Sequence, residues 1–304
     1  GCLCLVGSEM CIRDRRCAHS IRIDSNTISR GKRMNESPLV SVCMPLYNKE
    51  EYVYESVKSI IDQTYQNWEL IICDNASTDT SLERIANFLR DPRVKLYKND
   101  ENIGLVANFK RVLSLATGKY IKLVYADDVI PSTCLERQVR VLEDPKNGRV
   151  SLSVICRKII NENSRDIFVM PCRYKAGIND GRKAIKKCFF FGTNLIGEPH
   201  VAMFRRFDIE TLPYADTDIG MWAFILEKGS LHVTTDLRSS FRICSNSLTT
   251  SMKLDYPKHY IALFDKIRRR MKFSYLLFAW FSFMCIILHF VRSFTISRIL
   301  RNAK

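Results

Sequence analysis

Apolar residues between positions 37 and 143 fall into two alternating patterns. Short, β-branched runs are typical of buried strands: LVSVCMP, WELIICD, RVKLYKN and KYIKLVYADD. The stretches between them, such as EEYVYESVKSIIDQT, place apolar residues three and four positions apart, which indicates helices with one buried face. Strands that alternate with helices through short connections form a mainly parallel sheet. The sequence therefore predicts an α/β fold of Rossmann-like type, with helices flanking the sheet.

The pattern is weaker after residue 150, where it still predicts three strands and two helices. The strands are VSLSVIC, DIFVMP and EPHVAMFRR, and the helices are GRKAIKKCFFF and DIGMWAFILEKG. We therefore divide the chain into one half of the fold at 34–135, a second half at 136–252 and a C-terminal segment at 253–304.

Positive charge is concentrated in the C-terminal segment. Residues 253–304 contain eleven Lys and Arg against Asp255 and Asp265, whereas residues 37–252 are nearly neutral, although the net charge of the chain is +15. A nearly neutral middle argues against a nucleic-acid-binding domain, and no basic-aromatic stripe or zinc-ligand spacing supports one.

An apolar stretch, FSYLLFAWFSFMCIILHFV, occupies residues 273–291 and contains no Asp, Glu, Lys or Arg. As a helix it would extend for ~28 Å, close to the thickness of a bilayer's hydrocarbon core. Three arrangements remain open: a helix that spans a membrane, one that lies in its interface, and one that packs on the domain. Because the neighbouring cations suit anionic headgroups, we expect this hydrophobic helix to hold the protein at the cytoplasmic face of a membrane, anchored or peripheral.

The first 33 residues differ in character from the rest. LVGSEMCIRDR at 5–15 resembles the translation of a sequencing adapter, and its apolar stretch is too short for a signal peptide. We therefore expect residues 1–33 to be a non-native or untranslated leader, with Met34 as the natural start.

The twelve cysteines include no CxxC pair. Cys43, Cys73 and Cys156 each lie in an apolar run. We expect such residues to be buried free thiols in a reducing compartment.

Carboxylates follow two of the predicted strands. Asp74 ends the second strand, and Asp127 and Asp128 end the fourth. Adjacent carboxylates repel each other unless a cation or several donors compensate, although a solvated turn is the ordinary alternative. Ligands of parallel sheets bind beyond the carboxyl ends of the strands, which favours a functional pair. Neither G-x-G-x-x-G after the first strand nor G-x-x-x-x-G-K-[ST] is present, which argues against a dinucleotide dehydrogenase or a P-loop NTPase.

Five separated blocks between residues 38 and 250 resemble glycosyltransferase family 2, in the family's order. They begin with VSVCMPLYNKEEYV, NIGLVANFK, IGEPHVAMFRR, DTDIGMW and FRICSNSLT. The resemblance implies a GT-A fold, a nucleotide-sugar donor, Mg²⁺ or Mn²⁺, and inversion at the anomeric carbon.

The resemblance also implies roles for residues on the donor side. YADD corresponds to the family's DxD motif, so Asp128 should bind the metal and Asp127 should face the donor ribose or the metal's waters. Tyr125 replaces the first Asp of the fuller D-x-D-D form. Asp74 matches the residue that reads the base, since a carboxylate accepts a hydrogen bond from a uracil or thymine imide. Pro45, Tyr47 and Asn48 match the loop that lines the nucleotide.

On the acceptor side, TDIGMW aligns Asp218 with the family's catalytic base, which deprotonates the acceptor hydroxyl. Asp216 is its competitor, and an N-cap is the ordinary role for Asp218. Arg242 fits a charge-assisted contact to the diphosphate. Cys244 stands where His is common. His200 either contacts the acceptor or is structural.

The sequence thus predicts an inverting glycosyltransferase of hexosyltransferase type, with a UDP- or dTDP-linked donor favoured. Its acceptor would be a hydroxyl of a glycan or lipid-linked molecule in cell-surface polysaccharide or glycolipid synthesis. Two alternatives remain. One is a polyprenyl-phosphate sugar synthase. The other, motivated by Tyr125, Gly220 and Cys244, is a catalytically weak relative that binds sugar nucleotides or scaffolds an assembly complex.

Overall fold

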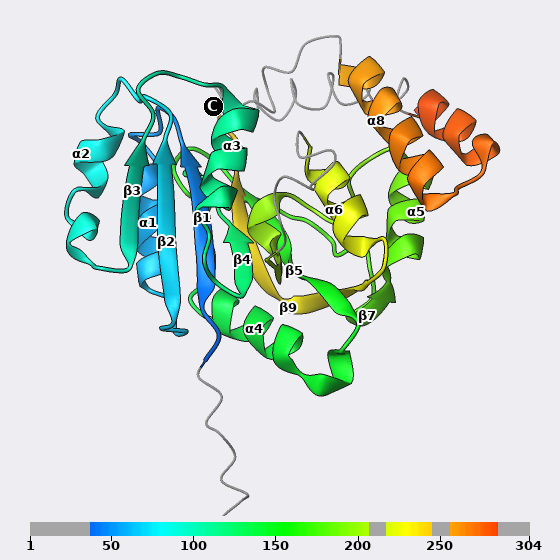
Figure 1. Ribbon diagram of the computed structural model, residues 1–304, viewed down its shortest axis with the longest axis horizontal. Helices are drawn as coiled ribbons and strands as arrows, with labels where there is room; N and C mark the ends of the chain where they lie inside the picture. The colour runs from blue at the N-terminus through cyan, green and yellow to red at the C-terminus, as the bar shows by residue number, and fades with distance from the viewer. Residues whose placement is uncertain (1–36, 207–216, 245–255, 285–304) are drawn as a thin grey trace, which may run out of the picture. The chain divides into compact units, whose positions relative to one another are not determined.

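The computed structural model of the chain describes residues 37–206, 217–244 and 256–284 (Figure 1). Within them, nine strands form one sheet in the order β3-β2-β1-β4-β8-β5-β9-β7, with β6 paired to β5. The predicted leader at 1–33, Asp216 and residues 285–291 lie outside the described residues, so what was predicted for them stays a prediction.

The first four strands are parallel and form one half of the sheet. They are β1 (Val40–Leu46), β2 (Trp68–Asp74), β3 (Val94–Lys98) and β4 (Tyr120–Leu123). The segments between them contain α1 (Val53–Ile61), α2 (Ser81–Ile85), η1 (Phe88–Arg90) and α3 (Leu105–Ser114). Figure 1 shows α3 in front of this half of the sheet and α1 behind it. Because the four strands point the same way, the loops that follow them share one edge of the sheet, as predicted.

The second half of the sheet is mixed. Its long strands β5 (Val150–Ile160) and β9 (Ser230–Arg242) are parallel, and β8 (Ala202–Arg205) runs antiparallel between β4 and β5. Strands β6 (Asp166–Val169) and β7 (Gly177–Asp180) are antiparallel to their partners. The other described elements of this half are α4 (Cys134–Glu143), η2 (Pro145–Asn147), α5 (Gly181–Phe191), η3 (Pro199–Val201) and α6 (Asp218–Leu226).

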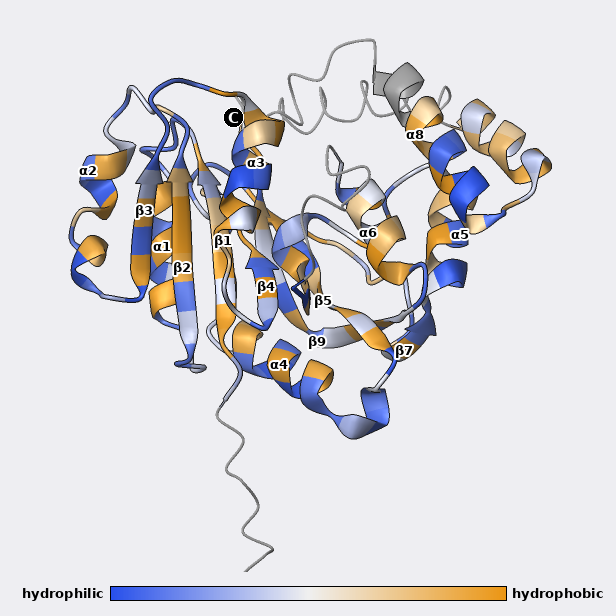
Figure 2. Cartoon of the chain, viewed as in Figure 1, coloured by the Kyte–Doolittle hydropathy of each residue, from blue (hydrophilic) through white to orange (hydrophobic). Residues whose placement is uncertain are grey.

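The apolar runs that predicted strands supply the core. β1 and β2 are buried along their whole length, and Figure 2 shows that apolar residues dominate these central strands, while the helices α1, α3 and α4 alternate between apolar and polar positions. This alternation is what one buried helix face requires.

A buried carboxylate, Glu69 on β2, ties three strands together. Its oxygens accept hydrogen bonds from the Ser41 hydroxyl at 2.5 Å, the Lys95 ammonium at 2.7 Å and the Thr117 hydroxyl and N–H at 2.7 and 3.0 Å. Burial alone would raise the pKa of Glu69, but these donors outweigh it and lower the pKa to about 2. Gly118, next to Thr117, permits this close approach, since a Cβ there would lie 2.7 Å from backbone atoms of Leu39 and Ser41.

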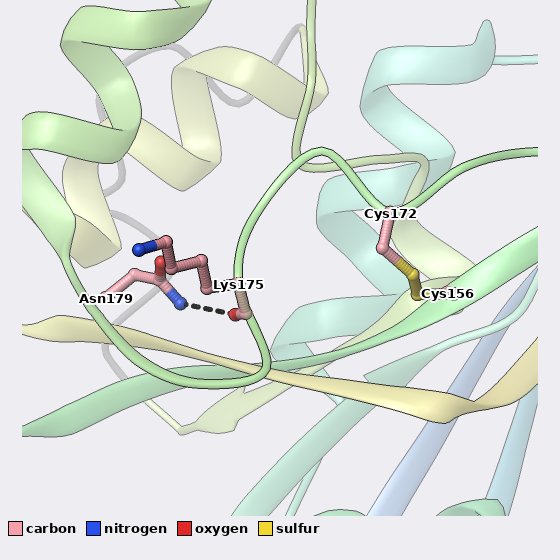
Figure 3. The surroundings of a disulfide bond; sticks show 4 residues. All are labelled: Cys156, Cys172, Lys175 and Asn179. Atoms are coloured by element: carbon pink, nitrogen blue, oxygen red, sulfur yellow. Dashed lines mark hydrogen bonds between the residues drawn. A yellow bond between two sulfur atoms is a disulfide. The ribbon is translucent and has the colours of Figure 1, made fainter.

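Cys156 is bonded to Cys172, which lies on the segment after β6 that folds back beside β5 (Figure 3). The prediction of a free thiol was therefore wrong for Cys156, because pairing with a cysteine sixteen residues away depends on a chain reversal that an apolar run does not reveal. Cys43 and Cys73 are free and buried, as predicted.

The chain continues into α8 (Tyr256–Met271) and a second helical stretch at 275–284. Phe281 and Phe264 are fully buried and stack with ring centroids 3.8 Å apart, so the described part of the apolar stretch packs on the domain. Of the helices within the described residues, none has the length and apolar character needed to cross a bilayer. The predicted hydrophobic helix at 273–291 is thus not confirmed as a membrane span.

Candidate active site

The loops after β1 and β2 are joined by side chains at the shared edge of the sheet. Asn48 has a positive φ of 47°, and its amide exchanges hydrogen bonds with Thr78, accepting from the Thr78 N–H at 2.9 Å and donating to its hydroxyl at 3.3 Å. The Asn48 N–H also donates to the Ser77 hydroxyl at 3.0 Å. At the base of the second loop, the buried Asp74 accepts from the Ser77 N–H at 3.3 Å. Ser77 therefore links Asn48 to Asp74, and the nucleotide-binding roles expected of both stay predictions.

Pro45 and Tyr47 differ in exposure. Pro45 is buried in β1, opposite Cys73 and beyond the last residue of β1 that pairs with β4, where its missing N–H leaves no gap in that pairing. Tyr47 is 43% exposed at the start of the loop. Pro45 thus supports the loop from below, and Tyr47 is available to a ligand above it.

The adjacent residues Asp127 and Asp128 point to different surroundings. The side chain of Asp127 is 17% exposed and accepts from the Lys49 ammonium at 2.6 Å. The side chain of Asp128 is fully buried, with one oxygen 2.9 Å from Nδ1 of His200 and the other 3.3 Å from the N–H of Arg242. Burial raises the pKa of Asp128 above its usual value, and His200 opposes the shift. A lysine and a histidine thus compensate the two carboxylates separately.

Arg242 ends β9 and is 1% exposed. Its guanidinium donates to the Asp127 carbonyl at 3.0 Å and to the Glu55 carboxylate at 2.5 Å, and it lies 4.7 Å over the Tyr52 ring. Within the described part of the chain, its other acceptors lie in the turn between β5 and β6: the carbonyls of Asn161 and Glu162 and the hydroxyl of Ser164. Arg242 therefore fastens that turn to the loop that carries Asp127.

Asp218 is the first residue of α6, and Thr217 is the N-cap, with its hydroxyl accepting from the Gly220 N–H at 3.2 Å. The capping role considered for Asp218 thus falls to Thr217. Burial raises the pKa of Asp218 to about 7, reinforced by the negative charges of Glu198 and Asp128 and opposed by Arg157. A carboxyl with this pKa is close to its optimum as a general base at neutral pH.

Glu198 and Arg157 support the same region. They form an ion pair at 2.9 Å between β5 and the loop before β8. The preceding Gly197 has φ 124°, which favours glycine, and its carbonyl accepts from the Trp222 indole N–H on α6 at 2.9 Å. The loop with Glu198 is thereby fixed against the helix that begins at Asp218.

Tyr125 lies close to carboxylates from both sides of the site. Burial raises the pKa of its hydroxyl well above the usual value, and the charges of Asp218, Asp128 and Asp127 add to this effect. The predicted base and the acidic pair therefore lie near the same phenol. Among the described residues, no group of three or more His, Cys, Asp or Glu could alone hold a metal ion.

The model of one protein family covers more than half of this chain. The sequence profile described as "Glycosyl transferase family 2" matches residues 41–212. This chain belongs to glycosyl transferase family 2. The prediction made from the five blocks is confirmed.

Individual relatives of this family 2 chain are also named as glycosyltransferases. TuaG of Bacillus subtilis (strain 168), a proposed teichuronic acid biosynthesis glycosyltransferase, is 33% identical over 219 residues, which are 71% of this chain and 84% of TuaG. The Escherichia coli UDP-Glc:alpha-D-GlcNAc-diphosphoundecaprenol beta-1,3-glucosyltransferase WfgD is 34% identical over 126 residues, 41% of this chain and 48% of WfgD. Matches to several other curated relatives likewise span less than half of their length.

Among solved structures, that of S. aureus TarS 1–349 in complex with UDP-GlcNAc matches with a TM-score of 0.58 and 18% identity, over 75% of this chain and 65% of TarS. This likeness concerns the fold, and it agrees with the predicted GT-A arrangement of a family 2 chain.

Two of the predicted roles in this family 2 chain need re-examination. The expectation that Asp128 binds a metal stays a prediction, but its buried carboxylate faces His200, and Asp127 is the more exposed of the pair. A phosphate contact of Arg242 also stays a prediction, although protein acceptors surround its guanidinium. Sequence reasoning missed Lys49 and Glu198, which act on Asp127 and Asp218. His200, predicted either to contact the acceptor or to be structural, faces Asp128.

Proposed function

We propose that this chain is an inverting glycosyltransferase that moves a sugar from a nucleoside-diphosphate sugar to an acceptor hydroxyl. The observation that carries the proposal is the arrangement around Tyr125. There Asp127, a partly exposed carboxylate at the donor edge, lies near Asp218, a partly buried carboxyl with a pKa of about 7. In-line transfer needs both: an anchor for the leaving diphosphate and a base for the attacking hydroxyl.

The donor nucleotide would bind at the loops after β1 and β2. Asp74 lies at the base of the joined loops, where a carboxylate oxygen can accept from the imide N–H of uracil or thymine, so a UDP- or dTDP-linked donor is favoured. Tyr47 and Asn48 would line the nucleotide above it. The name of the relative WfgD, which specifies UDP-Glc, agrees with this choice.

Asp127 is the residue that fits a Mg²⁺ or Mn²⁺ ion at the donor edge. Hard cations of this kind are often held by one or two carboxylates together with substrate phosphates, so one accessible carboxylate suffices. When bound, the ion would neutralise charge on the leaving diphosphate. Lys49 already pairs with Asp127 at 2.6 Å, so its ammonium is placed to contact the diphosphate if that pair opens.

Asp218 would act as the base. Its raised pKa leaves a large fraction ionised at neutral pH while keeping the carboxylate basic enough to accept the hydroxyl proton. Glu198 would maintain this pKa through its negative charge, which makes it a positioning residue for the reaction.

The acceptor would be a hydroxyl in cell-surface polysaccharide or glycolipid synthesis. The names of TuaG and WfgD, which refer to teichuronic acid and to a diphosphoundecaprenol-linked sugar, support this class. A lipid-linked saccharide is the acceptor we favour.

The experiment is donor turnover by the purified chain with a panel of UDP-, dTDP- and GDP-sugars, with Mg²⁺, Mn²⁺ or EDTA, and without acceptor or with lipid-linked saccharides. We expect metal-dependent turnover of a UDP- or dTDP-sugar that falls about 10²- to 10⁴-fold in Asp218→Asn. Glu83→Gln, an exposed carboxylate on α2, serves as the matched control and should be unaffected. Donor binding by calorimetry without turnover under any condition would instead support a scaffold.

A further inference from the structure

Helices α5, α8 and the stretch 275–284 pack together at one end of the fold (Figure 1). Three buried rings, one from each element, form the contact: Phe189 and Phe264 have centroids 4.0 Å apart, and each lies within 5.4 Å of Phe281. The inner face of 275–284 is thus fixed to the domain, and its outer face has a defined orientation.

The outer face is apolar. Leu276, Trp280 and Phe283 follow one another at helical spacing and are 82%, 43% and 56% exposed. Phe190 and Phe191 of α5 continue this face, since the Phe190 ring stacks on Trp280 at 5.7 Å and contacts Phe191 at 5.2 Å. The Trp280 indole N–H donates to the Phe190 carbonyl at 2.8 Å, which holds the two helices in register. We call these five residues the aromatic surface.

Cations border the aromatic surface. α5 contains four of them and no acidic residue: Arg182, Lys183, Lys186 and Lys187. On α8, Lys266, Arg269 and Arg270 are exposed, and Lys272 precedes 275–284. The two arginines pair with Asp265 and Glu227, which leaves the two lysines as the cations of this segment without an ion pair among the described residues. Figure 2 shows the polar positions of α5 and α8 beside the apolar positions of the stretch that follows. Arg268 and Arg182 lie over aromatic rings of 273–284, with Arg268 5.6 Å from Tyr275 and Arg182 5.7 Å from Phe273.

We propose that the aromatic surface inserts into the boundary between headgroups and acyl chains of an anionic bilayer, with 275–284 lying parallel to the membrane. Phe281 fixes the inner face of 275–284 to α5 and α8, so this stretch lies against the domain and offers its outer face for insertion. Amphipathic helices with aromatic and leucine side chains on one face and cations beside it bind in the interface plane. The proposal does not depend on the proposed catalytic function.

A second copy of the chain is the main competing occupant. A two-fold interface would place each aromatic surface against the same surface of its partner, and would therefore bring the bordering cations of both copies together. Anionic headgroups attract these cations instead, at about 1 kcal/mol per Lys or Arg near the surface. Charge complementarity thus favours the bilayer.

The fluorescence of Trp280 can report directly on insertion into the bilayer. The chain has three tryptophans, and the other two, Trp68 and Trp222, are buried. We expect the full chain to sediment with vesicles of phosphatidylglycerol and phosphatidylcholine, and its tryptophan emission to shift to the blue. Lipids brominated near the headgroup end of the acyl chain should quench this emission more than lipids brominated near the chain terminus.

The test compares one double variant with a matched control. Leu276→Glu/Phe283→Glu should lower vesicle binding by at least about tenfold, because it removes apolar side chains and adds charges that anionic lipid repels. Phe168→Glu on β6, where the phenylalanine is 52% exposed, should bind as the unmodified chain does. Equal binding by the double variant, stronger quenching from the chain terminus, or no sedimentation at all would overturn the proposal. So would a concentration-dependent dimer, seen by ultracentrifugation, that the double variant abolishes while vesicle binding is absent.

Discussion

Glu69 in the first half of the fold and Asp218 in the second are both carboxyl groups in largely buried positions, yet their pKa values differ in direction. Four donor groups surround Glu69 and lower its pKa to about 2. Asp218 begins a helix among other carboxylates, and its pKa is raised to about 7. Burial raises the pKa of both groups, so the number of hydrogen-bond donors decides whether the net shift is downward or upward.

This difference in pKa distinguishes carboxylates that stabilise the fold from carboxylates that could take part in proton transfer. A carboxylate held by several donors stays ionised and joins strands, as Glu69 does. A carboxylate placed among like charges is available to exchange a proton near neutral pH. The two residues of the acidic pair also differ in their surroundings. Asp127 pairs with Lys49 near solvent, whereas Asp128 is buried against His200.

After Asp218→Asn, the largest effects should come from changing Asp127 and Asp128 one at a time. Asp127→Asn should lower donor turnover by about 10²- to 10³-fold, because it removes the accessible anchor for a cation at the diphosphate. Its melting temperature should change little. Asp128→Asn should instead lower the melting temperature, since it removes a buried partner of His200. Turnover assays and thermal melts of both variants decide the assignment: metal dependence lost only with Asp128 would return the metal role to that residue.

Arg242→Lys tests whether Arg242 contacts the donor diphosphate or stabilises the fold. A lysine cannot replace a guanidinium that binds several acceptors in a fixed plane, so we expect a loss of about 3 kcal/mol in the free energy of unfolding. Urea unfolding measures this loss. A raised KM for the donor with unchanged stability would show that Arg242 serves the diphosphate.

The smallest effect concerns Glu69. Because its pKa is lowered on folding, its contribution to stability is fully present above about pH 4.5 and is lost as the pH falls toward 2. Glu69→Gln should therefore cost about 2–3 kcal/mol at pH 7 and much less at pH 2.5. Urea unfolding across this range provides the measurement. Equal losses at both pH values would mean that packing, rather than charge, explains the effect.

The sequence was sufficient to predict site residues where the order of strands and helices determines their position. Parallel strands end at one edge, so the sequence alone predicts that Asp74 and Asp127 lie at the same edge of the sheet. It was insufficient where a side chain's partner lies far along the chain. His200 is 72 residues after Asp128, and Glu55 is 187 residues before Arg242. Neither the inward turn of Asp128 nor the anchoring role of Arg242 has a local signature.

The pH dependence of donor turnover tests the central claim most directly, namely that Asp218 accepts the acceptor proton. A base must be ionised to act, so kcat/KM should rise tenfold per pH unit below about pH 7 and level off above it. In Asp218→Asn, the residual rate should lack this inflection. A profile for the unmodified chain that is flat from pH 5.5 to 8, or an inflection that persists in the variant, would contradict the account.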